Sequence, residues 1–205
     1  MVINMLIIGI TGGSGAGKTS AVMALETLGA KAIDCDILYH EMLQTDKNLT
    51  DEITGNFEKI LTNGKMDRKK LGAIVFNNSD ALLKLNKITH KFITMELERR
   101  ISSFKSEGVD IIAIDAIALI ESGLSDTCNV VVGIIAPVDR RVSRIIKRDG
   151  LTREQALTRI NAQKPESFFR GNCDFIVENA FDTPTAFEDY CKNYFKHIID
   201  SIACS

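Results

Sequence analysis

Short apolar runs alternate with amphipathic stretches along most of the chain. Met5–Ile10, Lys31–Asp34, Asp110–Asp115 and Asn129–Ala136 are predicted strands, and Phe175–Val177 is a candidate fifth strand. Strands separated by helical patterns favour a parallel sheet that is covered by helices on both faces. The predicted fold class is therefore α/β, a three-layer αβα arrangement built on a five-stranded parallel sheet.

Helical periodicity fills the segments between these strands. Lys18–Leu28 carries apolar residues on one face and ends before Gly29, a typical helix stop. Thr152 and Gln155 form a capping box for a helix that extends to about Gln163. The last helix opens at Pro184, and its predicted inward stripe consists of Phe187, Cys191, Tyr194 and Ile198.

One long segment interrupts the alternation of strands and helices. Residues 37–105 are mostly helical in pattern, which indicates an inserted helical lobe. Residues 1–36, 106–140 and 171–205 then form the core around the sheet. Residues 141–170 are predicted to form a short helical lid.

Composition narrows the possible partners. The 205 residues carry a net charge of −2, so we expect no general attraction to nucleic acid or to an anionic membrane. No apolar run approaches the ~20 residues that cross a bilayer. The five cysteines include no CxxC pair, which favours a reducing cytoplasm. We expect a cytoplasmic protein that is a monomer or a weak homo-oligomer.

The strongest motif follows the first predicted strand. Residues 12–19, GGSGAGKT, match the phosphate-loop pattern GxxxxGK[ST], with a helix predicted after it. Backbone N–H groups of such a loop and the helix N-terminus bind phosphates. Lys18 can reach the β- and γ-phosphates of ATP, and the Thr19 hydroxyl can bind Mg²⁺. The predicted ATP-binding residues are Gly13, Ser14, Gly15, Ala16, Gly17, Lys18, Thr19 and Ser20. The core is therefore the predicted nucleotide-binding part of the chain, and the helical lobe of residues 37–105 is the predicted acceptor-binding part.

Acidic residues lie at the carboxyl ends of two predicted strands, where ligands of open parallel sheets bind. Asp34 and Asp36 are two apart, so on an extended chain they would share a face. We choose Asp36 as the general base for an attacking hydroxyl, and Asp115 as the residue that holds Mg²⁺ or orders the site. The alternative for all three is a helix cap or a surface turn.

Arginines gather around the predicted lid. Arg140, Arg144 and Arg148 are spaced by four, so they share a helix face, and further arginines follow at positions 153, 159 and 170. Guanidinium groups on a closing lid stabilise charge on a transferring phosphoryl group, and Arg144 and Arg148 are our catalytic candidates. The alternative is a solvated face that Asp139 and Asp149 balance.

Together, these motifs resemble the dephospho-CoA kinase family over nearly the whole chain. The matching segments are the phosphate loop, Ile33–Asp36 (IDCD), Asn63–Arg68 (NGKMDR) with Ile74–Phe76, Leu85–His90, Arg144–Gln163 and Cys173–Asn179. The resemblance implies ATP and Mg²⁺ as cofactors, and phosphorylation of the ribose 3′-hydroxyl of dephospho-CoA. It implies Asp36 as the base, Asp36, Arg68, His90 and Asp115 on the acceptor side, and Asn179 near the adenine.

The chain also departs from that family pattern. The usual DVPLLFE reads DAIALIE from Asp115, Lys91 replaces a proline after His90, and Phe169 stands where a lysine is usual. His90 can equally be a locally packed helix residue. One alternative function is another small-molecule or nucleotide kinase of the same fold. Another is a non-catalytic nucleotide-binding module, although a guanine-reading NKxD segment is absent.

Overall fold

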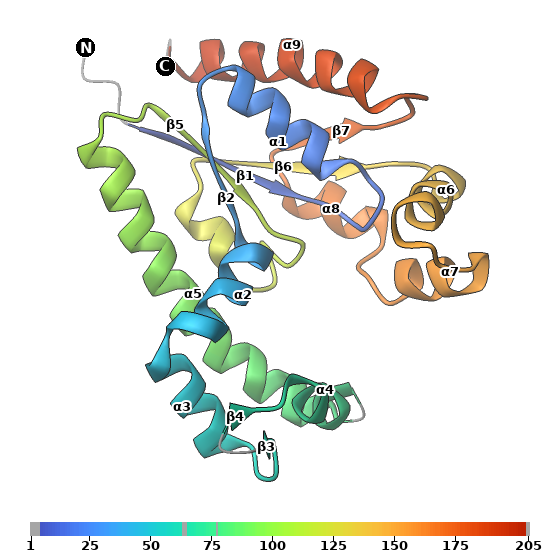
Figure 1. The fold of residues 1–205 in the computed structure, drawn as a ribbon. Coiled ribbons are helices and arrows are strands. Elements are labelled where there is room, and N and C mark those ends of the chain that lie inside the picture. The colour runs from blue at the N-terminus through green and yellow to red at the C-terminus, as the bar shows by residue number, and fades with distance from the viewer. Residues whose placement is uncertain (1–4, 63–64, 77, 204–205) are drawn as a thin grey trace. The chain divides into compact units, whose positions relative to one another are not determined.

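The computed structural model describes residues 5–62, 65–76 and 78–203, and these residues form two compact units (Figure 1). The first unit contains the chain up to Asp34 and from Ser103 onward. The second unit is Cys35–Ser102. Among the described residues, every helix is too short or too polar to span a membrane.

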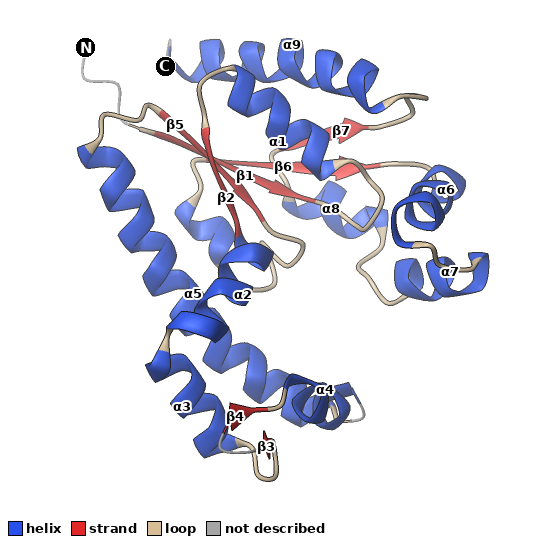
Figure 2. Cartoon of the chain, in the orientation of Figure 1, coloured by secondary structure: helices blue, strands red, loops and turns tan. Residues whose placement is uncertain are grey.

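The first unit is built on a five-stranded sheet in the order β2-β5-β1-β6-β7 (Figure 2). Its strands are β1 (Leu6–Thr11), β2 (Lys31–Asp34), β5 (Ile111–Asp115), β6 (Val130–Ile135) and β7 (Phe175–Glu178). All neighbouring pairs are parallel, as the sequence predicts, and the candidate fifth strand is present. The predicted α/β class with a five-stranded parallel sheet is confirmed.

The register of the sheet brings several chain segments to one edge. Asp115 pairs with both Ile10 and Asp34, and Thr11 pairs with Gly133. Thr11, Asp34 and Asp115 are the last residues of β1, β2 and β5. The phosphate-loop motif after β1 and the acids that end β2 and β5 therefore leave the sheet at the same edge, where ligands of parallel sheets bind.

Two helices cover one face of this sheet, and both meet the main hydrophobic core (Figure 1). They are α1 (Lys18–Thr27) and α9 (Pro184–Ala203). All four residues of the predicted inward stripe of α9 meet the core, although Tyr194 is only half-buried. Phe195, which the stripe does not include, is fully buried. The shorter α8 (Glu166–Asn172) packs against β6 and β7 from the opposite side.

A helix pair lies between β6 and α8 in the chain. It consists of α6 (Val138–Asp149) and α7 (Arg153–Asn161), which share a small apolar cluster of Val142, Ile145, Ala156 and Ile160. Gly150 adopts φ 66° and ends α6. The predicted capping box of Thr152 and Gln155 is present. The helix ends at Asn161, so Gln163 lies in the connection to α8.

The second unit is predominantly helical, as the sequence predicts. Its helices are α2 (Cys35–Thr45), α3 (Lys47–Asn56), α4 (Arg68–Phe76) and α5 (Ser79–Ser106), of which α5 continues beyond the unit boundary. Asp46 caps α3 by accepting from the backbone N–H groups of Asn48 and Leu49. A small antiparallel pair, β3 (Leu61–Thr62) and β4 (Lys65–Met66), was not predicted, since two-residue strands leave no periodic signal.

Candidate active site

Backbone geometry explains why the loop between β1 and α1 needs glycine. Gly12 has φ 142°, and a Cβ atom there would lie 2.1 Å from the carbonyl oxygen of Ile134. Gly17 has φ 112° at the N-cap of α1, and a Cβ atom there would lie 2.2 Å from Nδ2 of Asn179. The loop turns back on itself, because the N–H of Ala16 donates to the carbonyl of Gly13 at 3.1 Å. The chain is therefore wrapped more tightly than side chains would permit.

Helix α6 supports the outer side of this loop. Arg141 Nε donates to the carbonyl of Ser14 at 2.9 Å. Arg144 donates to the carbonyls of Gly15 at 3.1 Å and Ala16 at 3.3 Å. Burial lowers the pKa of both guanidinium groups, and the charge of Arg140 lowers that of Arg144 further. Arginine side chains thus donate hydrogen bonds to three carbonyl groups of the loop. The backbone N–H groups at the start of α1, from Gly17 onward, have no partner within the helix and are available to a bound ligand.

Asn179 supports the same loop from the end of β7. Its side chain is 4% exposed, its Nδ2 donates to the carbonyl of Ala16 at 2.8 Å, and its Oδ1 accepts from Arg144 at 3.0 Å. The structure therefore places this predicted nucleotide-binding residue behind the loop, against its backbone. Lys18, the first residue of α1, lies with its Nζ 3.9 Å from Oδ1 of Asp115.

Asp34 and Asp115 end their strands as predicted, and Asp36 does not lie on the strand. Asp34 is the last residue of β2, and α2 begins at Cys35. Asp36 is thus the second residue of a helix, where consecutive side chains rotate by about 100°. The argument that Asp34 and Asp36 share the face of one extended strand is wrong. Asp36 is exposed, and it belongs to the second unit.

The predicted acceptor-side residues of the second unit have their own contacts. Arg68 begins α4, and its NH2 lies 2.6 Å from Nδ1 of His40 on α2. Burial raises the pKa of the neighbouring Tyr39, and the charge of Arg68 opposes that shift. His90 is half-buried within α5. Asn63 and Gly64 of the NGKMDR segment lie outside the described residues.

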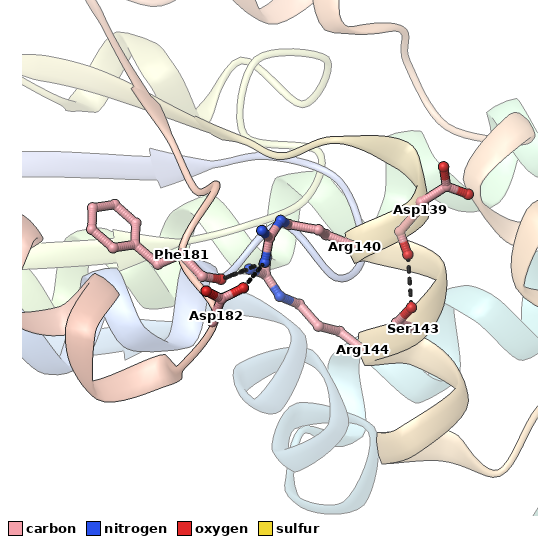
Figure 3. Close-up of a pocket in the computed structure, with 6 residues that line it drawn as sticks. All are labelled: Asp139, Arg140, Ser143, Arg144, Phe181 and Asp182. Carbon is pink, nitrogen blue, oxygen red and sulfur yellow. Dashed lines mark hydrogen bonds and ion pairs between the residues drawn. The ribbon is translucent and has the colours of Figure 1, made fainter.

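Two of the three arginines in the predicted row share their surroundings. Arg140 donates to Asp182 at 2.7 Å and to the carbonyl of Phe181 at 3.2 Å, and Arg144 donates to the same carbonyl at 3.0 Å. Both line a cavity of about 270 Å³ together with Asp139, Ser143, Phe181 and Asp182. Figure 3 shows how these side chains lie. Arg148 instead donates to its neighbour Asp149, whose pKa the contact lowers to about 2. Of the three, Arg144 also donates to the loop.

Two loop contacts escaped the sequence interpretation. The spacing by four predicts a row of Arg140, Arg144 and Arg148, and it does not include Arg141. A spacing of three or four also joins Arg141 to Arg144, and that signal could have found it. Gln163 is predicted only as the end of a segment that resembles the family. Its side-chain amide makes two hydrogen bonds to Ser14 of the loop and one to Arg141. Nothing in periodicity marks a polar residue in a turn.

A second cavity, of about 330 Å³, borders the loop at Gly13. Its wall comes from the segment after β5, at Ile117 and Glu121, and from the connection between α7 and α8, at Gln163 and Lys164. Among the described residues, no group of three His, Cys, Asp or Glu side chains is arranged as a metal site. A divalent ion that is bound through one carboxylate, one hydroxyl and substrate phosphates does not need such a group.

Comparison with known proteins connects this site to one family. The sequence profile described as dephospho-CoA kinase matches residues 6–184. A dephospho-CoA kinase from Dehalococcoides mccartyi is 38% identical over 177 residues, which cover 85% of this chain and 89% of the relative. One from Carboxydothermus hydrogenoformans is 34% identical over 176 residues, 85% of each chain. The solved structure of dephospho-CoA kinase from Campylobacter jejuni aligns with a TM-score of 0.65 at 26% identity, covering 94% of this chain and 96% of that one.

Proposed function

The chain belongs to the dephospho-CoA kinase family, and from this membership we propose that it phosphorylates the ribose 3′-hydroxyl of 3′-dephospho-CoA with ATP. The products are coenzyme A and ADP. The observation that carries the proposal is the glycine loop at the start of α1, whose outer carbonyls are held by Arg141, Arg144 and Asn179. A loop held from behind presents its remaining N–H groups to phosphate without having to reorganise.

The nucleotide end of the reaction rests on Lys18 and Thr19, the first two residues of α1. Lys18 is proposed to bind the β- and γ-phosphates. Thr19 and Asp115 supply a hydroxyl and a carboxylate, the oxygen donors that Mg²⁺ prefers. When bound, Mg²⁺ would neutralise charge on the phosphate oxygens. Residues Gly13–Ser20 complete the proposed ATP site, with Asn179 fixing the backbone of Ala16.

The acceptor end rests on Asp36 as the proposed general base. Its carboxylate would orient the 3′-hydroxyl and take its proton as the ribose oxygen bonds to the γ-phosphorus. The bond from that phosphorus to the β–γ bridging oxygen breaks, and ADP leaves with the electron pair. Arg68 and His90 of the second unit are proposed to bind the acceptor, and so is Asp115. The contact of Arg68 with His40 supports an ordered guanidinium at that position.

Arg144 and Arg148 are the proposed catalytic cations. Arg144 donates to two carbonyls of the loop, so its charge lies next to the residues that would hold the phosphates. Its proposed role is to stabilise the charge of the transferring group while it shapes the loop. Arg148 donates to Asp149 through both Nε and NH2, and its role would require that pair to separate.

The activity is tested by steady-state kinetics with ATP and dephospho-CoA, with ADP release coupled to a reporter reaction and coenzyme A identified by mass. We expect Lys18→Ala to abolish turnover, because it removes the cation of the loop. The matched control is Lys31→Ala at an exposed position of β2, which should keep normal rates. Near-normal turnover by the Lys18 variant would contradict the proposed nucleotide site.

The same assay separates the other candidate functions. ADP release with a nucleoside monophosphate or another alcohol, and none with dephospho-CoA, would indicate a different kinase of this fold. ATP binding without a phosphorylated product from any acceptor would indicate a regulatory module. A cytoplasmic location and a monomeric or weakly oligomeric state remain predictions from the sequence.

A further inference from the structure

Three side chains meet at the third position of the phosphate loop, and we call them the Ser14 corner: Ser14, Arg141 and Gln163. Gln163 Oε1 accepts from the N–H of Ser14 at 2.9 Å and from Arg141 NH2 at 2.9 Å. Gln163 Nε2 lies 2.8 Å from Oγ of Ser14. Arg141 also donates from Nε to the carbonyl of Ser14 at 2.9 Å. The corner joins α6, the connection after α7 and the loop.

The chemistry of these groups fixes which atom donates. A backbone N–H and a guanidinium N–H can only donate, so the atom between them must be the amide oxygen of Gln163. Its NH₂ group therefore faces the Ser14 hydroxyl, and Ser14 Oγ accepts. Because that oxygen receives a hydrogen bond from Gln163, its own proton is directed to a different acceptor. Within the described part of the chain, the structure shows no acceptor for that proton.

The position of the corner indicates which acceptor suits this proton. Ser14 lies at the opposite end of the loop from Thr19, next to Gly13, which borders the cavity of about 330 Å³. Gln163 and Lys164 line the same cavity. The guanidinium of Arg141 lies beside Ser14, and the cavity wall carries one cation, Lys164, and one carboxylate, Glu121. A hydroxyl proton next to Arg141 suits an anionic oxygen, and in a nucleotide loop this end lies toward the terminal phosphate.

We propose that Gln163 is a positioning residue that makes the Ser14 hydroxyl a hydrogen-bond donor to the γ-phosphate of ATP, so that the chain distinguishes ATP from ADP. The inference rests on the proposed function, because it needs ATP in the loop. Gln163 itself bonds to the loop and to Arg141. Its effect on the nucleotide passes through the proton of Ser14, which a γ-phosphate can accept and which ADP has no group to reach.

A simpler role for Gln163 would be to hold the connection after α7 on the loop. The two roles predict different results for Gln163→Glu. A glutamate keeps the oxygen that accepts from Ser14 N and from Arg141, so the connection stays attached. Its second oxygen can no longer donate to Ser14 Oγ, and the hydroxyl turns its proton toward the new carboxylate. Positioning is lost while the attachment is kept.

The experiment measures the dissociation constants of ATP and ADP by titration calorimetry in wild type, Gln163→Glu and Gln155→Glu. We expect Gln163→Glu to raise the ratio of the dissociation constant of ATP to that of ADP by at least about tenfold. A change of this size corresponds to the loss of one hydrogen bond to a charged group. Gln155→Glu is the matched control. It adds the same charge on α7, where a glutamate can serve the capping box equally well.

Ser14→Ala and the double variant test the route through the hydroxyl. Ser14→Ala should also reduce the preference for ATP, and Gln163→Glu should then add less than it does alone. Thermal unfolding shows that each variant is folded. An unchanged ratio of the ATP and ADP constants in Gln163→Glu, or full additivity with Ser14→Ala, overturns the inference and leaves the kinase proposal intact. Wild type that binds neither nucleotide would overturn both.

Discussion

Replacing Asn179 by alanine should destabilise the first unit, because this residue is buried and bridges the loop to α6. The change removes the hydrogen bond from Nδ2 to Ala16 at 2.8 Å and the one from Arg144 to Oδ1 at 3.0 Å. A neutral hydrogen bond contributes about 1 kcal/mol to the free energy of unfolding, and one to a charged group about 1.5–3 kcal/mol. We therefore expect a loss of about 3 kcal/mol.

The magnitude is measured by urea unfolding followed by circular dichroism. A loss of this size is a large part of the ~5–15 kcal/mol by which a domain is stable. It should lower the melting temperature by about 6–12 °C in a chain of this length. Asn172→Ala is the matched control, since Asn172 is exposed on α8 and its Nδ2 bonds only within its own helix, to Phe168. That control should change the free energy by less than about 0.5 kcal/mol.

Equal effects of the two substitutions would falsify the reasoning, because the buried bridge would then contribute no more than an exposed amide. Nucleotide affinity provides a second test. Since Asn179 supports the backbone of Ala16, its removal should weaken the binding of ATP and of ADP to a similar extent. A change confined to one of the two nucleotides would show that Asn179 acts on the ligand directly.

Three further predictions follow from individual contacts. Gly17→Ala should abolish nucleotide binding, as seen by titration, because φ 112° and the approach to Asn179 leave no room for a methyl group. Asp36→Asn should keep ATP affinity and reduce kcat by at least about 10²-fold, and a change in KM alone would refute its role as base. Hydrogen bonding, first to Arg99, lowers the pKa of Glu96 to about 2, so the stability it contributes is present above its usual pKa near 4.5 and is lost toward pH 2. Urea midpoints measured against pH should therefore fall less steeply in acid for Glu96→Gln than for wild type or for Glu98→Gln, an exposed control.

The sheet and the loop could be predicted because their signals are local. A run such as Asn129–Ala136 is apolar over one strand length, and the glycines of the loop stand beside the lysine that they serve. The end of β2 at Asp34 was predicted to the residue, but the start of α2 directly after it was not. Asp34-Cys35-Asp36 suits a strand end and a helix start equally well, and the structure begins the helix at Cys35.

The support of the loop could not be predicted, because it depends on long-range polar contacts. Arg141 and Gln163 reach Ser14 across 127 and 149 positions of the chain. Hydrophobic periodicity places helices against sheets, but it does not say which side chain of a polar face meets a backbone carbonyl. The omission of Phe195 from the predicted stripe has a related cause, since periodicity does not rank the burial of two neighbouring aromatic residues on a helix.

The small apolar cluster of α6 and α7 gives this helix pair a cooperativity of its own. Val142 and Ile145 pack on Ala156 and Ile160, apart from the main core of the first unit. Such a cooperative unit opens as a whole, so hydrogen exchange of the amides in both helices should report one shared opening free energy. Phosphates that tighten the loop would slow that exchange through Arg141 and Arg144, so occupancy of the loop would be measurable as slower hydrogen exchange throughout α6 and α7.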